Sequence, residues 1–335
     1  MEIRGLSALV TGATGFIGSR LAERLATEEA VRVRAMVRNT KKAERLRKFP
    51  LEIVKADLLD VSSLRTAIEG CDLIFHCAAI VRETGDRDEF LRVNVRGTEN
   101  ILKVSIDGGI RKFIHFSSVA TYGMDPPDGT DETTAFHPCG NLYCDTKIAA
   151  EKAVWASHQE AGLPVVVIRP ANVYGPYSNP WTIRPMKLIN SGQMMLVNGG
   201  TGICNYVYVD NLLDATLAAT KSDQSIGQAY LISDGMTVMW KEFFGYYARM
   251  AGKPKLRSVP EGLAKTIALG MEITSKLTGK SPKITREAVS FLTRTARFST
   301  EKARRKLGYQ PRFSLEEGMK LTEQWLREAG YLPGA

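Results

Sequence analysis

The sequence has few cysteines and histidines and no long apolar run. Its five cysteines form no CxxC pair and its four histidines are scattered, so no metal-ligand spacing is present and no metal is expected. Unpaired cysteines in odd number are typical of a reducing compartment. No segment is apolar enough to cross a bilayer, and the first residues lack the apolar core of a signal peptide. We therefore expect a cytoplasmic protein. The cysteines are Cys71, Cys77, Cys139, Cys144 and Cys204.

The excess of positive charge is not concentrated in one segment. The 45 Lys and Arg residues outnumber the 36 Asp and Glu residues, which gives a formal net charge of +9. They are spread over 335 residues with no aromatic-interleaved basic patch, so we expect a solvated basic surface and no nucleic-acid partner. The content of 44% hydrophobic and 24% charged residues is that of a globular chain and excludes a disordered one.

The first half of the chain alternates strand and helix patterns. Helices are expected at 16–28, 89–105 and 141–160, and a charged helix after residue 39. The alternation predicts an α/β fold with a doubly wound, Rossmann-type parallel sheet. The expected strands are 6–10, 31–37, 51–54, 73–75, 113–116 and 165–168, the last with four consecutive β-branched residues, as in a strand buried on both faces.

The alternation stops near Pro170, where proline-rich loops begin. Helical patterns follow over much of 240–279 and twice between 300 and 330, without a linker. We therefore predict a Rossmann domain over 1–170 and, over 171–335, a smaller α/β lobe that binds mainly substrate and is interleaved with the sheet. The segment 253–286 mixes apolar and basic residues, and we expect it to be mainly core, with contact to a membrane surface as the alternative.

Three glycines, Gly12, Gly15 and Gly18, follow the first expected strand. Gly12 allows a tight turn, Gly15 lets the backbone approach a pyrophosphate, and Gly18 lets the helix pack on the strand. The N-terminus of that helix presents unpaired N–H groups to phosphates. Because the glycines lie between a strand and a helix, they predict a dinucleotide site.

The end of the second expected strand distinguishes the two nicotinamide cofactors. An acidic residue there would bind the ribose of NAD and repel a 2′-phosphate, whereas this sequence has Arg38, followed by Lys41 and Lys42. A guanidinium can bind a phosphate and stack on adenine. We therefore favour NADP(H), with NAD(H) as the alternative.

Tyr143 and Lys147 are four residues apart on an expected helix, which places them on one face. A free tyrosine has a pKa of about 10, too high for a base at neutral pH, and a neighbouring ammonium lowers it. Ser117 and Ser118 follow the expected strand 113–116, at the edge where parallel sheets bind ligands. The combination predicts an acid–base site.

In these and further motifs the chain resembles the extended short-chain dehydrogenase/reductase family. The resemblance covers about the first two-thirds of the chain. It is carried by TGATGFIG at 11–18, ADL at 56–58, HCAA at 76–79, VNVRGT at 93–98, FSSVATYG at 116–123, YCDTK at 143–147, RPANVYGP at 169–176 and VYVDN at 207–211.

The resemblance implies roles for these residues. Ser118 would hydrogen-bond the substrate carbonyl, Tyr143 would donate the proton during reduction, and Lys147 would hold the nicotinamide ribose. Oxidation would run in reverse. The implied cofactor contacts are Gly12, Thr14, Gly15, Phe16, Ile17, Gly18, Arg38, Asp57, Leu58, Ala78, Ala79, Asn94, Ser117, Lys147, Pro170, Asn172 and Val173.

Three features narrow the substrate. Dehydratases carry an acidic pair after the catalytic serine or threonine, where this chain has Val119 and Ala120. Sugar-nucleotide enzymes commonly carry an arginine before the VYV strand, where Cys204 and Asn205 supply no charge. The segment 205–212 resembles that of steroid dehydrogenases and sterol decarboxylases. So do 263–277, 284–291, 298–309 and 315–318 in the C-terminal part.

We therefore expect an oxidoreductase for a ketone or secondary alcohol on a sterol-, lipid- or polyketide-like substrate. The rival enzyme is an NDP-sugar 4-epimerase with tightly bound NAD, and a rival of another class is a catalytically silent dinucleotide-binding regulator. By the same resemblance, the helices around 89–105 and 142–160 would form a four-helix bundle in a homodimer.

Overall fold

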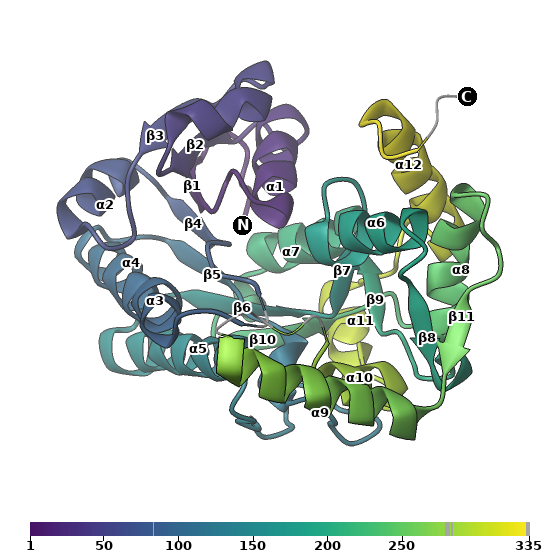
Figure 1. The fold of residues 1–335 in the computed structure, drawn as a ribbon. Coiled ribbons are helices and arrows are strands. Elements are labelled where there is room, and N and C mark those ends of the chain that lie inside the picture. Colours follow the sequence, from purple (N-terminus) through teal and green to yellow (C-terminus); the bar gives the residue numbers. More distant parts are fainter. Residues whose placement is uncertain (83, 279–281, 283, 333–335) are drawn as a thin grey trace.

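Seven parallel strands form the main sheet in the order β10-β6-β5-β4-β1-β2-β3 (Figure 1). In the computed structural model, residues 1–332 are described except 83, 279–281 and 283. The order is that of a doubly wound Rossmann sheet with β10 added at the β6 edge, so the expected fold class is confirmed. The strands are β1 (Ser7–Thr11), β2 (Arg32–Val37), β3 (Glu52–Lys55), β4 (Leu73–His76), β5 (Lys112–Phe116), β6 (Val165–Pro170) and β10 (Gln228–Ile232).

Helices cover both faces of this sheet, and each face has its own core. In β1, Ala8 and Val10 face the core that contains α1 (Phe16–Thr27) and α7 (Val209–Lys221). Leu9 faces the opposite core, which contains α2 (Val61–Ile68), α4 (Gly97–Asp107) and α5 (Leu142–Ala161). Successive strand residues point to opposite faces, so a strand covered on both sides is apolar throughout. Burial on both faces explains the apolar runs in the sequence.

Most expected elements are present with bounds shifted by one or two residues, and the exceptions are local. The helix expected at 89–105 consists of α3 (Arg87–Phe90), a π-helical turn (Leu91–Arg96) and α4. The charged segment after residue 39 is a 3-10 helix (Thr40–Lys48), whose first turn is capped by the Asn39 side chain. The strand and helix patterns of the sequence do not predict α2, although the Asp60 side chain caps its N-terminus by accepting the N–H groups of Ser62 and Ser63.

The segment after Pro170 builds a smaller set of elements beyond the carboxyl edge of the sheet (Figure 1). Two short parallel pairs lie there: β7 (Asn172–Tyr174) with β9 (Tyr206–Tyr208), and β8 (Met195–Val197) with β11 (Arg257–Val259). Helix α7 and strand β10 return to the main sheet. The other helices are α6 (Arg184–Asn190), α8 (Trp240–Met250), α9 (Glu261–Thr278), α10 (Arg286–Thr293), α11 (Glu301–Leu307) and α12 (Leu315–Glu328).

The expectation that the segment 253–286 is mainly core is wrong for α9. Of the side chains that the structure describes in this helix, only the small Ala264 and Ala268 are buried. Leu263 and Ile273 are 52% and 53% exposed, and Ile267 and Leu269 are also exposed. Apolar periodicity alone does not show which face a helix buries. The part of this segment at 279–281 and 283 lies outside the described residues.

Among the described residues, none of the helices combines the length and the apolar character that crossing a bilayer requires.

Candidate active site

The glycine turn forms a cradle between β1 and α1. Gly12 has φ +67, and a Cβ there would lie 2.8 Å from the backbone nitrogen of Ala78. A Cβ on Gly18 would lie 2.4 Å from the carbonyl oxygen of Gly12. Both positions therefore require glycine for close backbone approach, and Gly12 requires it for its backbone conformation as well.

The N-terminus of α1 is open to a phosphate group. Its N-cap, Gly15, supplies no side-chain cap, and the first turn contains no acidic residue. Thr14 and Gly15 are exposed, while Phe16 and Ile17 are half-buried. Free N–H groups at a helix N-terminus attract anions, so this cradle fits the pyrophosphate of a dinucleotide.

Arg38 follows the last residue of β2 and is exposed. Its side chain makes no hydrogen bond or ion pair with any described residue, and Lys41 and Lys42 beside it are exposed too. In the loop that follows β3, Asp57 is half-buried and its carboxylate accepts the backbone N–H of Leu59. Leu58 is buried and Ala78 and Ala79 are half-buried at the same edge of the sheet. The implied cofactor contacts of these strands therefore share one edge.

Asn94 and Ser117, two residues that the resemblance implies as cofactor contacts, form hydrogen bonds with other protein atoms in this structure. The Asn94 amide accepts the N–H of Ile80 at 2.7 Å and donates to the Ile80 carbonyl and the Thr146 hydroxyl. The Ser117 hydroxyl donates to Glu151 at 2.5 Å. With these atoms occupied, Asn94 and Ser117 position the loop after β4 and the end of β5 rather than present free groups to a ligand.

Ser118 and Tyr143 come together at the carboxyl end of β5. Ser118 begins a short 3-10 helix (Val119–Tyr122), where its hydroxyl accepts the N–H of Ala120 at 3.1 Å. Tyr143 lies in the first turn of α5, which Asn141 caps. Burial raises the pKa of Tyr143, and its hydrogen bond with the Ser118 hydroxyl opposes that rise. The two hydroxyls expected to meet the substrate oxygen are therefore adjacent.

Lys147 points toward the sheet. Its ammonium donates to the carbonyl oxygen of Phe116 at 2.5 Å, and the residue is 4% exposed. Burial lowers the pKa of Lys147 to about 8, and the nearby Glu151 carboxylate acts in the opposite direction. The expected fall in the pKa of Tyr143 is not what the structure shows, because burial of the phenol outweighs stabilisation of the phenolate.

Behind these residues lies a buried ionic network that the sequence patterns did not reveal. Glu151 follows Lys147 by one helical turn, is 0% exposed, and pairs with Arg169 of β6 at 2.6 Å. Arg169 also donates to the hydroxyl of Tyr122 at 2.6 Å. The spacing Tyr143, Lys147, Glu151 on one helix face is a signal that could have indicated a third functional position.

Two stacked histidines connect the strands below the site. The His76 ring bridges the hydroxyls of Thr11 and Thr98, and it stacks on His115 with a centroid distance of 5.5 Å. Burial, reinforced by the Lys147 ammonium, lowers the pKa of His76 to about 3 and that of His115 well below its ordinary value. Both rings are therefore neutral near pH 7.

The residues expected around the nicotinamide lie where β6 gives way to β7. Pro170, Asn172 and Val173 are buried there, and the side-chain nitrogen of Asn172 meets the Cys204 thiol and no oxygen acceptor among the described residues. Beyond them, Trp181, Trp240 and Phe291 form an aromatic cluster with centroid distances of 5.3 to 5.7 Å. This side of the site is therefore largely apolar.

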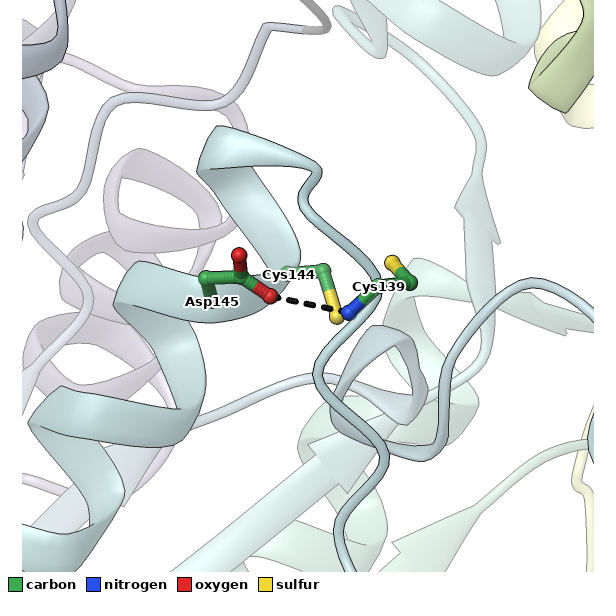
Figure 2. Close-up of side chains that lie close together, drawn as sticks. All are labelled: Cys139, Cys144 and Asp145. Carbon is green, nitrogen blue, oxygen red and sulfur yellow. Dashed lines mark hydrogen bonds between the residues drawn. The ribbon is translucent and has the colours of Figure 1, made fainter.

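Figure 2 shows Cys139, Cys144 and Asp145 around the start of α5. Their thiol sulfurs and a carboxylate oxygen, which are atoms that could ligate a metal ion, lie within 4.8 Å of one another. The Asp145 carboxylate accepts the N–H of Cys139 at 3.1 Å, which fixes the loop before Tyr143. Burial raises the pKa of the Cys144 thiol, and a protonated thiol is a poor metal ligand. The arrangement has a structural explanation without a metal.

A Rossmann sheet with a glycine cradle and adjacent serine, tyrosine and lysine side chains at its carboxyl edge defines an enzyme of the extended short-chain dehydrogenase/reductase type. The chain belongs to the NAD dependent epimerase/dehydratase family, whose model matches residues 8–233.

Relatives and solved structures agree on the fold and differ in substrate. A 3-beta-hydroxysteroid dehydrogenase of Mycolicibacterium neoaurum is 30% identical over 93% of this chain and 88% of that protein. A 2-alkyl-3-oxoalkanoate reductase of Shewanella oneidensis is 28% identical over 93% of this chain and 84% of its own length. The UDP-glucuronic acid 4-epimerase of Bacillus cereus, solved with UDP-glucuronic acid and NAD, superposes with a TM-score of 0.78 at 22% identity, over 97% of this chain and 100% of that one.

Proposed function

We propose that this oxidoreductase interconverts a ketone and a secondary alcohol on a hydrophobic, sterol-, lipid- or polyketide-like substrate. The observation that carries the proposal is the contact between Ser118 and Tyr143 at the carboxyl edge of the sheet, beside the glycine cradle. The aromatic cluster on the substrate side favours an apolar molecule. The steroid and oxoalkanoate relatives support the same class.

In the proposed mechanism, each residue acts on one atom. A bound nicotinamide supplies or accepts hydride. The hydroxyls of Ser118 and Tyr143 hold the substrate oxygen, and Tyr143 donates its proton as a ketone is reduced. Lys147, charged below about pH 8, stabilises the phenolate that remains. Glu151 pairs with Arg169 and accepts the Ser117 hydroxyl, and it thereby joins α5, which carries Tyr143 and Lys147, to β6 and to the end of β5 beside Ser118.

For the cofactor we favour NADP(H). Arg38 is exposed at the end of β2, and no described residue competes for its guanidinium. A 2′-phosphate would meet that cation and those of Lys41 and Lys42. The family description and the NAD-bound structural relatives support NAD(H) as the alternative.

A second candidate is an NDP-sugar 4-epimerase with tightly held NAD. The solved sugar-nucleotide epimerases share the fold. Although the segment before the VYV strand contains no arginine, the structure brings one close to it from a distant part of the chain. Arg294, at the end of α10, lies near the Cys204 thiol and supplies a cation there. A silent regulator is disfavoured because it would need no proton donor beside the cofactor cradle.

The deciding experiment compares reactions under one set of conditions. The pure protein is denatured and assayed for released nucleotide. It is then supplied with NAD+ or NADP+ and with 3-hydroxysteroids, long-chain 3-hydroxyalkanoates or UDP-galactose. We expect the protein to be purified without bound nucleotide and to oxidise a hydrophobic alcohol once NAD+ or NADP+ is added. Retained NAD together with conversion of UDP-galactose to UDP-glucose would establish the epimerase instead.

For the assembly we propose a homodimer in which α4 and α5 pair with the same helices of a second copy. A shallow groove between them is lined by five small or apolar side chains, of which Ile106 is 37% exposed, and by five polar or charged ones, Glu99, Lys103, Asp107, Ser157 and Glu160. Light scattering on the eluting protein should give twice the chain mass, and Ala156→Arg should give a monomer. A wild-type monomer at micromolar concentration would contradict the proposal. The apolar and small lining residues are Leu102, Ile106, Ala153, Ala156 and Ala161.

A further inference from the structure

Arg294 is a buried cation without an anionic partner among the described residues. The residue is 5% exposed, and its Nε and Nη2 atoms have no hydrogen-bond acceptor among the described residues. No described carboxylate lies within ion-pair distance of it. An unpaired buried charge is costly, and the cost is removed if an anion binds.

The backbone and neighbouring rings hold this side chain in place. The N–H of Arg294 donates to the Ser290 carbonyl at 3.1 Å, and its own carbonyl accepts the N–H of Ile203 at 2.8 Å. The guanidinium lies 4.1 Å from the centroid of Phe291 and 5.3 Å from that of Phe298. Because both ends of the residue are fixed, the cation is positioned before any ligand arrives.

This position is on the substrate side of the site. Phe291 belongs to the aromatic cluster, and Phe298 contacts Tyr122 in the helix that begins at Ser118. Arg294 and Trp240 have buried side-chain nitrogens without a partner among the described residues, and the buried side-chain nitrogen of Asn172 meets only the Cys204 thiol. Donors gathered without an acceptor indicate that a ligand supplies the acceptor.

Nothing described in the chain neutralises the cation. Burial lowers the pKa of Arg294 to about 10, so it is still charged at neutral pH. Burial also raises the pKa of the neighbouring Cys204 thiol, so no thiolate forms there. Asp125, the described carboxylate whose charge acts on Arg294, is exposed and forms no ion pair with it.

We propose that Arg294 is the subsite for a carboxylate on the substrate, an inference that rests on the proposed function and names its substrate class. The N–H groups of Nε and Nη2 lie on one edge of the guanidinium, the edge that binds both oxygens of a carboxylate side-on. The substrate is thus an acid: a carboxylate held at Arg294 and a carbonyl or hydroxyl held at Ser118 and Tyr143.

A carboxylate fits this subsite better than a nucleotide diphosphate. One guanidinium balances one negative charge, whereas a diphosphate brings about two and is usually bound by several donors and cations. Here the cation is enclosed by Phe291, Phe298 and Cys204. The next arginine along the chain, Arg297, is already paired with Asp128 at 2.5 Å.

The test compares an acid with its ester. Binding of tetradecanoate, methyl tetradecanoate and UDP is measured by quenching of tryptophan fluorescence in the wild type, Arg294→Met, Arg294→Lys and the control Arg297→Met. We expect the wild type to bind the acid roughly tenfold or more tightly than the ester. Arg294→Met should lose this preference, Arg294→Lys should keep part of it, and Arg297→Met should keep all of it.

Thermal unfolding separates binding from a structural role. Because the free cation is unpaired, Arg294→Met without ligand should melt at or above the wild-type temperature. A lower melting temperature with the acid preference intact would overturn the proposal, as would equal affinity for acid and ester in the wild type. Binding of UDP that depends on Arg294 would overturn it too, by assigning the subsite to a diphosphate.

The two proposals fail in different ways. Oxidation of neutral hydrophobic alcohols without any preference for acids would remove the carboxylate subsite and leave the oxidoreductase proposal standing. Preferential binding of tetradecanoate through Arg294, without turnover of any hydrophobic alcohol or ketone, would retain the subsite and remove the proposed reaction.

Discussion

Glu151 and Arg169 form an ion pair of 2.6 Å at the base of the candidate active site, with Glu151 fully buried. The same carboxylate accepts hydrogen bonds from Ser117 and from the indole of Trp155. One side chain therefore connects α5, β6 and the end of β5. Its removal would leave the Arg169 charge buried and uncompensated.

Glu151→Ala should lower the free energy of unfolding by about 3–5 kcal/mol, because breaking a buried pair strands one charge. Denaturant unfolding followed by circular dichroism measures the loss. Lys152→Ala, at an exposed position on the same helix outside the groove of the proposed dimer, is the control and should stay within about 0.5 kcal/mol of the wild type. Equal stability of the two variants would show that the ion pair contributes little.

Tyr143→Phe should lower turnover by ~10²-fold or more while cofactor affinity stays nearly unchanged, because the phenol supplies the proton and not the cofactor site. Steady-state kinetics and a cofactor titration on the same preparation measure the two effects. Ser118→Ala is the companion variant, and it should lower turnover without removing the proton donor. Near-normal turnover of Tyr143→Phe would exclude this residue from the mechanism.

Arg38→Ala should weaken NADPH binding roughly tenfold or more and leave NADH binding nearly unchanged, because only NADPH carries the 2′-phosphate. Fluorescence titration of the reduced cofactors provides both constants. Arg47→Ala, an exposed arginine in the neighbouring 3-10 helix, controls for general loss of positive charge. If Arg38→Ala weakened both cofactors equally, Arg38 would not recognise the phosphate.

Gly12→Ala should destabilise the glycine turn by more than the conformational cost of its positive φ alone. Gly70 has a similar positive φ of +69 and open space within 4 Å of where a Cβ would lie, so Gly70→Ala isolates the conformational cost of about 1–2 kcal/mol. At Gly12 the new methyl group would also meet the backbone of Ala78. We expect a larger loss of stability and weaker cofactor binding, measured by unfolding and titration. Matching losses in the two variants would contradict a close backbone contact.

The stacked histidines predict a pH dependence of stability. Their folded-state pKa values are depressed, that of His76 to about 3, while the unfolded chain takes up a proton near the ordinary value of 6.5. The stability they contribute is therefore complete above about pH 6.5 and is lost as the pH falls toward 3, at about 1.4 kcal/mol per pH unit for each ring.

His115→Phe should remove one of these two contributions and flatten the loss of stability between pH 6 and pH 4 by about that amount. Unfolding free energies measured across this range provide the slope. Ile114→Val, in the same strand, should lower stability by about 1 kcal/mol at every pH and keep the wild-type slope. An unchanged slope in His115→Phe would show that this ring does not resist protonation.

Much of the sheet could be predicted because the sequence patterns of its strands and of the glycine turn fit only one local structure. The run Val165–Ile168 is apolar on both faces, and the glycines at 12, 15 and 18 fit only a tight strand-to-helix turn. The break in the helix expected at 89–105 could not be predicted. A π-helical turn depends on the partners of Asn94, which come from residues 14 and 52 positions away.

The candidate site was predictable where one motif placed the residues together. Ser118, Tyr143 and Lys147 belong to short patterns. The helical spacing could have indicated that Glu151 shares their face, but not that it pairs with Arg169, and nothing local places Arg294 beside Cys204. These contacts join distant segments that no local pattern links. Sequence also could not tell which face of α9 is buried, because Ala264 and Ala268 contribute less apolar character than the exposed Leu263 and Ile273.

The pairing of β10 with β6 has a consequence for synthesis of the chain. Strand β6 is complete at Pro170, but its outer edge is covered only by residues 228–232, after three more strands and two more α-helices. Until then a nascent chain carries an unpaired edge rich in valine and isoleucine, the kind of edge that recruits other strands and aggregates. The emergence of residues 228–232 from the ribosome should therefore mark the point at which this edge of the growing polypeptide no longer needs protection by a chaperone.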